Sequence, residues 1–149
     1  MIKIAQRYGL IMMGGFIAFF LSMYAIGLAQ NYWLRLFFVV IHLGVLSLSI
    51  NAYRRDELNG GTNPKQSVKG VAHGMATSFI GVLGFCIFLF LFLTLDSNLM
   101  SEINAQFSVS RGFNPVTAAA FMFVEGIAAG LIGSYVLTRI VDSKLEAIA

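Results

Sequence analysis

Four long apolar stretches, separated by short polar segments, dominate the pattern of hydrophobic and polar positions. They cover residues 8–28, 34–53, 68–95 and 116–137. A helix rises about 1.5 Å per residue, so about 20 apolar residues cross a hydrocarbon layer about 30 Å thick. The pattern therefore predicts an all-α integral membrane protein, a four-helix bundle whose single transmembrane domain occupies residues 1–149.

The linker between the third and fourth stretches, residues 96–114, has a pattern of its own. Leu99, Ile103 and Phe107 recur there at helical spacing among polar neighbours. One of the residues 96–98 is suited to cap such a helix. The linker therefore predicts a short interfacial helix on the membrane surface, in the outer loop between spans three and four.

Composition supports a membrane domain and argues against a soluble one. Hydrophobic residues make up 58% of the chain and charged residues 11%, whereas globular domains carry about 25% charged residues. The net charge is +3, but the basic residues flank the apolar stretches and do not form one stripe. This distribution predicts contact with membrane lipids and no nucleic-acid partner.

The basic residues also predict the orientation of the bundle. With four spans both termini lie on one side of the membrane, and Arg35 and Arg111 lie on the other. The side with the termini holds the remaining basic residues: Lys3, Arg7, Arg54, Arg55, Lys65, Lys69, Arg139 and Lys144. The positive-inside rule therefore places both termini in the cytoplasm. Among these residues, Arg54 and Arg55 are the predicted contact for anionic lipid headgroups.

Small residues at four-residue spacing predict the faces on which helices pack. The three rows are Gly14, Ala18 and Ser22; Gly70, Gly74 and Ser78; and Gly126, Gly130 and Ser134. Such rows let two helix backbones approach closely in a bilayer. Packing within a bundle of four helices is not expected to use all three rows. A row left over is suited to pack against another protein, which predicts an oligomer or a larger membrane complex.

Glu125 and His42 form the candidate polar site inside the membrane. Glu125 lies near the middle of the last span, where an ionisable side chain costs about 2.5–3.5 kcal/mol on insertion scales, so it should turn toward protein or a wet cavity. His42 lies at a similar predicted depth, about 13 Å below the outer boundary. The pair is interpreted either as a proton or cation site, or as a neutral glutamic acid bonded to a helix carbonyl or hydroxyl that fixes helix register.

Other chemistry finds little support in the sequence. Cys86 is the only cysteine, which excludes an internal disulfide and predicts an inert thiol. His73 lies near the inner boundary and is interpreted as a satisfied polar contact, too far in depth from His42 for a shared metal site. No nucleophile-and-base spacing, cofactor motif or catalytic carboxylate pair occurs. We therefore predict no enzyme activity, no cofactor and no metal.

Three motifs resemble those of the four-one-nine-nine domain-of-unknown-function family. They are RRDELNGG at 54–61, QSVKG at 66–70 and GIAAGLI at 126–132, the last preceded by the helix start at Pro115. The family comprises small four-span proteins of certain Gram-negative bacteria. The resemblance covers nearly the whole chain and implies a bacterial inner (cytoplasmic) membrane and four helices. It implies no activity.

Two functions remain open at this point. The first is a non-enzymatic structural or accessory subunit, which associates with itself or with a larger inner-membrane complex. The alternative is a dimeric, proton-coupled small transporter or channel that uses Glu125 with His42.

Overall fold

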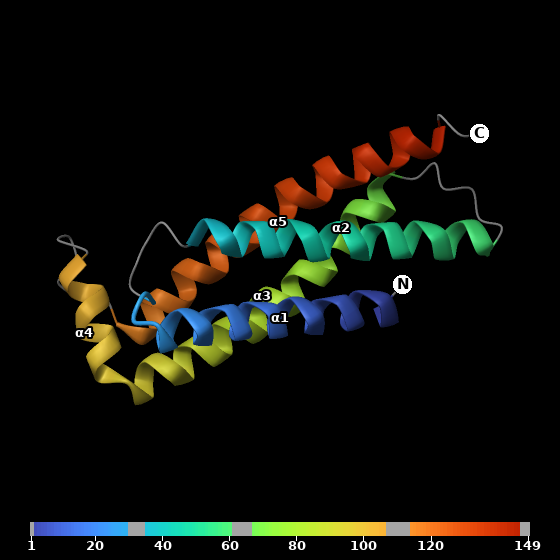
Figure 1. The fold of residues 1–149 in the computed structure, drawn as a ribbon. Helices are drawn as coiled ribbons and strands as arrows, with labels where there is room; N and C mark the ends of the chain where they lie inside the picture. Colours follow the sequence, from blue (N-terminus) through green and yellow to red (C-terminus); the bar gives the residue numbers. More distant parts are fainter. Residues whose placement is uncertain (1, 30–34, 61–66, 107–113, 147–149) are drawn as a thin grey trace.

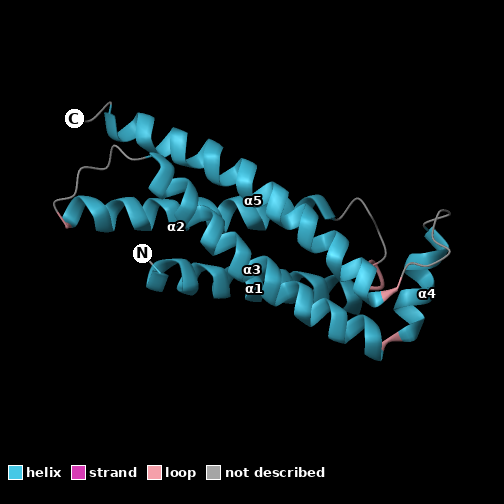
Figure 2. Ribbon diagram, turned by 180° about the vertical axis from the view of Figure 1, so that it is seen from behind, coloured by secondary structure: helices cyan, strands magenta, loops and turns pink. Residues whose placement is uncertain are grey.

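The computed structural model describes residues 2–29, 35–60, 67–106 and 114–146. Every regular element in these ranges is a helix (Figures 1 and 2). In chain order they are α1 (Ile2–Ala25), α2 (Arg35–Asn59), α3 (Ser67–Leu95), α4 (Ser97–Gln106) and α5 (Pro115–Glu146).

Four of these helices are long and apolar enough to cross a membrane. The spanning segments are Ile2–Ala25, Leu36–Asn59, Val68–Leu95 and Pro115–Lys144. Their length and composition indicate a multi-pass membrane protein. At their charged ends α1, α2 and α5 extend beyond the predicted spans, because the charged residues there continue the helices instead of ending them. At its other end α1 stops at Ala25, three residues before the predicted end of the span.

Helix α3 occupies the centre of the bundle. It packs against α1, α2 and α5, while α2 also contacts both α1 and α5. Helix α4 runs across one end of the bundle at a steep angle to the long helices (Figure 1). Its predicted place on the membrane surface stays a prediction, and Phe107 lies outside the described residues.

Local signals in the sequence explain where the helices end and begin. Gly27, with a φ of 70°, follows α1 in the left-handed conformation that glycine adopts without strain. The amide of Leu28 donates to the Met23 carbonyl at 2.9 Å, and that of Gly27 to the Tyr24 carbonyl at 3.0 Å. These two backbone hydrogen bonds form a Schellman motif, which satisfies carbonyls that the helix end leaves free.

Capping side chains lie at the N-terminal ends of α4 and α5. Asp96 Oδ1 accepts the amides of Asn98 and Leu99 at 3.1 and 3.2 Å, which places the α4 cap within the predicted residues 96–98. Tyr24 donates its hydroxyl to Asp96 Oδ2 at 2.6 Å. That bond, together with the amide bonds, lowers the pKa of the Asp96 carboxyl below its usual value. At α5, Thr117 donates its amide to Asn114 Oδ1 at 2.9 Å, so Asn114 is the cap.

Two of the predicted small-residue rows face each other across the interface between α3 and α5. The helices run antiparallel, so each step of four residues along α3 meets a step of four back along α5. A Cβ added at any glycine of this interface would lie 2.5–2.7 Å from the facing side chain. From one end to the other, the facing pairs are Gly70 with Thr138, Gly74 with Ser134, Ser78 with Gly130, and Val82 with Gly126.

The third predicted row does not pack inside the bundle. Gly14, Ala18 and Ser22 are exposed, and a Cβ at Gly14 would meet nothing within 4 Å. Helix α1 instead approaches α3 through Gly9, whose added Cβ would lie 2.8 Å from Ile80. The spacing of the row was visible in the sequence, but the face of α1 that turns toward α3 was not.

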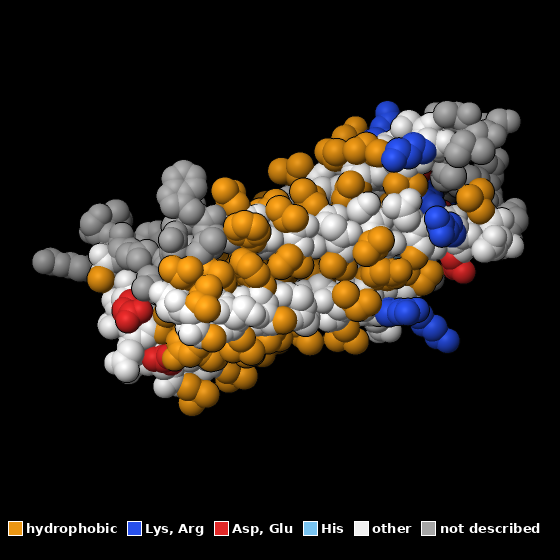
Figure 3. Space-filling view, viewed as in Figure 1, with side chains coloured by type: hydrophobic (Ala, Val, Ile, Leu, Met, Phe, Trp, Pro, Cys, Tyr) orange, Lys and Arg blue, Asp and Glu red, His pale blue; other side chains and the backbone are white. Residues whose placement is uncertain are grey.

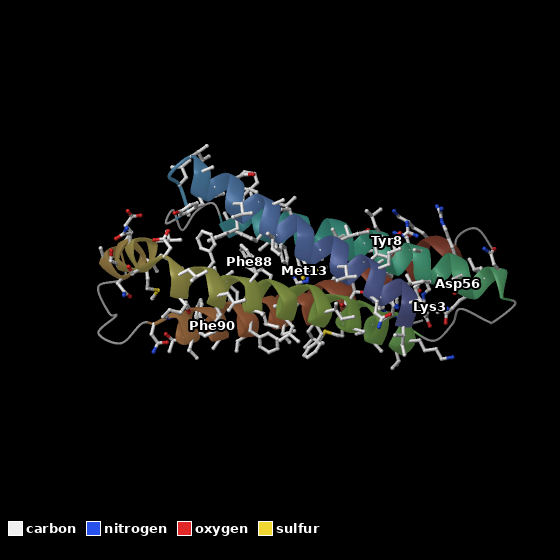
Figure 4. All side chains as sticks on the ribbon, turned by 90° about the horizontal axis from the view of Figure 1, so that it is seen from below. Lys3, Tyr8, Met13, Asp56, Phe88 and Phe90 are labelled. Carbon is white, nitrogen blue, oxygen red and sulfur yellow. The ribbon has the colours of Figure 1, made fainter. Side chains whose placement is uncertain are left out.

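Apolar side chains cover the length of the bundle and charges gather at its ends. Figure 3 shows an apolar surface along the middle of the molecule and Lys and Arg side chains at the end near the N-terminus of α1. Figure 4 shows Met13 and Phe88 between α1 and α3, whereas Phe90 lines an apolar groove between α3 and α5. This distribution is the one expected for a bundle whose middle lies in lipid.

Candidate functional site

A lateral pocket of about 50 Å³ lies between α2 and α5. Its walls are largely aromatic and aliphatic, with Phe16, Phe38 and Phe85 contributed by three different helices. Its two ionisable residues are His42 and Glu125. The pocket has room for water, since a cavity needs about 10–15 Å³ of such volume to hold one water molecule. The structure therefore brings the two predicted polar residues to one small cavity.

His42 is held by α3 and not by Glu125. The side chain is only 4% exposed, and its Nε2 lies 2.9 Å from Ser78 Oγ in a hydrogen bond. The edge of the ring meets Phe16, with the ring centroids 5.8 Å apart. Gly130 leaves the space on the other side, because an added Cβ there would lie 3.5 Å from Nε2. The histidine is thus fixed between α1, α3 and α5.

Glu125 lies on the lateral side of α5, and the predicted direction of its carboxyl, toward protein or a wet cavity, stays a prediction. The residue is exposed in the chain and lines the pocket beside Gly126 and Ala129. Within the described residues it makes no hydrogen bond or ion pair. The reason is geometric: Gly126 and Gly130 take the face of α5 that meets α3, so the adjacent position 125 is turned to the side of the helix.

A second group of buried polar side chains continues along α3 toward the other end of the bundle. Ser49 of α2 hydrogen-bonds both His73 Nε2, at 3.0 Å, and Thr77 Oγ1, at 2.9 Å. The ring of Tyr53 stacks on His73, with the centroids 4.4 Å apart. Three of these residues, Ser49, His73 and Thr77, are fully buried. We call the buried polar side chains of α2, α3 and α5 at this end of the bundle the polar seam. Its members are Ser49, His73, Thr77, Ser134 and Thr138.

The polar seam ends in an ion cluster built around Arg54. Arg54 Nη1 lies 2.6 Å from Glu57 Oε2, and Nη2 lies 2.9 Å from Asp142 Oδ1 on α5. The hydroxyl of Tyr53 donates to Glu57 Oε1 at 2.7 Å. Gly70 makes room for the guanidinium, since an added Cβ would lie 3.0 Å from Nη2. The cluster therefore joins α2, α3 and α5 at one end of the bundle.

The position of Arg54 corrects its predicted role at lipid headgroups. Its side chain is only 1% exposed and is committed to two carboxylates. Arg55, the next residue, is exposed at the same end. On a helix, consecutive side chains point about 100° apart, so one arginine of a pair can enter the core while the other faces outward.

Three polar atoms of the polar seam have hydrogen-bonding capacity that the described residues do not use. They are His73 Nδ1, Ser134 Oγ and Thr138 Oγ1, all buried. Buried polar groups normally find a partner in protein or ordered water. Among the described residues no three of the His, Cys, Asp and Glu side chains are grouped to hold a metal ion.

No family model, curated protein or solved structure matches this chain. The resemblance to the four-span family therefore stays a prediction. The features that bear on function are therefore the pocket, the polar seam and the outer faces of the helices.

The polar seam was largely missed in the sequence. Ser49, Thr77 and Thr138 have no distinctive spacing in the sequence, and each could have been an isolated hydroxyl bonded to its own helix. The available signal was that His42 and Ser49 fall seven residues apart on α2, and His73 and Ser78 five apart on α3. The two residues of α2 pair with the two residues of α3, His42 with Ser78 and Ser49 with His73, at two depths of the bundle.

Proposed function

We propose that the protein is a non-enzymatic membrane subunit that associates through the outer face of α5, with a second copy of this chain as its partner. The observation that carries the proposal is the exposed Glu125 in the middle of a spanning helix. A polar side chain at that depth costs about 2.5–3.5 kcal/mol when it faces lipid. An association that covers it removes this cost.

The outer face of α5 is suited to such an association. Between residues 121 and 135 its exposed residues recur at helical spacing and are apolar apart from Glu125 and Tyr135: Phe121, Val124, Glu125, Ala128, Leu131, Ile132 and Tyr135. Helix α5 is also the least buried of the four spans. The face therefore remains open after the bundle has formed.

Symmetry favours a second copy as the partner. Copies inserted in the same direction place Glu125 at the same depth, so a two-fold axis along the membrane normal brings the two carboxyl groups together. Two protonated carboxyl groups, or two that share a proton, can hydrogen-bond to each other. The distribution of Lys and Arg supports an orientation with both termini in the cytoplasm, and the resemblance supports a bacterial inner membrane.

The dimer is tested by measuring association of fluorescently tagged chains in liposomes over a range of protein-to-lipid ratios. We expect the wild type to dimerise and Glu125→Leu to weaken the dimer by about 1–2 kcal/mol, the typical contribution of one polar contact between spanning helices. The matched variant Glu125→Gln keeps a hydrogen-bonding group and should stay close to wild type. A monomeric wild type, or equal association of Glu125→Leu, would refute the proposal.

The polar seam favours a second candidate function, a proton pathway through the bundle. Together with Glu125 and His42 at the pocket, the seam places groups that can carry protons from mid-span to the Arg54 cluster. The unused capacity of His73 Nδ1 and Ser134 Oγ suits water molecules that would link these groups. Glu125 would carry the proton at mid-span, with His42 beside it in the same pocket.

This pathway is tested by proton flux into liposomes that contain a pH-sensitive dye. Ser49→Ala removes the hydroxyl that bridges His73 and Thr77, so flux should fall to the level of empty vesicles. Ser22→Ala removes an exposed hydroxyl that bonds only its own helix, and flux should be unchanged. If the wild type conducts no protons, or Ser49→Ala conducts like wild type, the pathway does not exist.

A further inference from the structure

A second, larger cleft opens between α1 and α2 at the basic end of the bundle. Its volume is about 770 Å³, within the range of sites that bind small molecules. Helix α1 contributes the residues from Lys3 to Tyr8, and α2 contributes residues from Leu48 to Asn59. Figure 4 shows Lys3 and Tyr8 of α1 at the same end of the bundle as Asp56 of α2.

The charges of this cleft suit an anion. Lys3, Arg7 and Arg55 are the cations that line it and Asp56 is the anion, so three positive charges and one negative charge leave two net positive charges. All four residues are exposed, and none of them forms an ion pair with a described residue. In this they differ from Arg54, whose charge is already neutralised by Glu57 and Asp142.

The depth of the cleft suits a lipid better than a free anion. From Asn59 at the end of α2, the lining continues to Leu48, which is roughly 16 Å farther along the helix axis at 1.5 Å per residue. Along this length apolar side chains, Ile4, Leu48 and Ala52, line the cleft together with the cations. A phospholipid presents the same two kinds of part, an anionic phosphate and apolar acyl chains.

We propose that this cleft binds the headgroup and upper acyl chain of an anionic phospholipid. Lys3, Arg7 and Arg55 hold the phosphate. Tyr8 and Asn51 provide hydrogen-bonding groups where the headgroup meets the chains, and Leu48 contacts the first part of an acyl chain. The site does not depend on how the outer face of α5 is covered, because the cleft lies between α1 and α2.

Native mass spectrometry of the detergent-solubilised chain, titrated with phosphatidylglycerol or phosphatidylcholine, tests the site. We expect one phosphatidylglycerol to bind in preference to phosphatidylcholine. The double variant Arg7→Gln/Arg55→Gln should weaken that binding by roughly thirtyfold, the ratio expected for the loss of two cations near an anionic headgroup. Arg7→Lys/Arg55→Lys keeps both charges and should restore most of the affinity.

A matched control separates a defined site from a general effect of positive charge. Lys69→Gln/Arg139→Gln removes two exposed cations from the same end of the bundle but outside the cleft, and binding should be unchanged. Equal weakening by both double variants, or no preference between the two lipids, would overturn the proposal. Displacement of phosphatidylglycerol by millimolar inorganic phosphate would instead show a free-anion site and would also overturn it.

Discussion

Arg54→Leu should destabilise the bundle by about 3 kcal/mol, the lower end of the range for breaking a buried ion pair by removal of one partner. The guanidinium is 1% exposed and joins Glu57 to Asp142, which are 12% and 13% exposed. Without it the two carboxylates remain close together and partly shielded from water. Because they keep some exposure, water recovers part of the loss, which is why the lower end applies.

The measurement is thermal unfolding in mild detergent, followed by circular dichroism. Arg55→Leu is the matched control, since the neighbouring arginine is exposed and outside the cluster, and surface substitutions usually change stability by no more than about 0.5 kcal/mol. Equal effects of the two substitutions would mean that the ion cluster does not hold the end of the bundle together.

The second large effect is on the stability of the bundle, which alanine substitutions at two glycines should change in opposite directions. Gly74→Ala should destabilise the bundle by about 1–3 kcal/mol, the usual cost of overpacking. The added Cβ would lie 2.5 Å from Ser134 Oγ and 2.8 Å from Ser134 Cβ. The Cβ of Ser134 cannot move without its backbone, so α3 and α5 have to separate.

Gly14→Ala should have the opposite effect. Its Cβ meets nothing within 4 Å, and alanine is favoured over glycine inside a helix by about 0.8–1.0 kcal/mol. The same unfolding experiment measures both variants. A neutral or stabilising Gly74→Ala would mean that α3 and α5 are not in close contact at Gly74 and Ser134.

The sequence was sufficient to predict the helices and one of their interfaces. Length and hydrophobicity determine the four spans, since a bilayer leaves helices as the way to satisfy the backbone in a chain of this composition. The rows that contain Gly74 and Gly130 meet across α3 and α5. Both rows consist of small residues at helical spacing, and this signal is local to each helix.

The sequence was not sufficient where the outcome depends on how a helix is rotated. Gly14 and Gly74 belong to rows of the same kind, yet one is exposed and the other is packed. Arg54 and Arg55 are the same residue type side by side, and only the first enters the core. Glu125 was expected to face other protein or a wet cavity. Which of these it meets depends on the rotation of α5 and on any partner, and a single sequence displays neither.

Disulfide cross-linking in native membranes tests the central claim, that the Glu125 face of α5 meets a second copy of itself. With Cys86 replaced by alanine, Val124→Cys introduces a thiol beside Glu125, at a position 67% exposed; Leu10→Cys on α1, at a position 56% exposed, is the control. On mild oxidation we predict that Val124→Cys forms a covalent dimer and Leu10→Cys does not. Absence of the dimer at position 124, or equal cross-linking at both positions, would contradict the account.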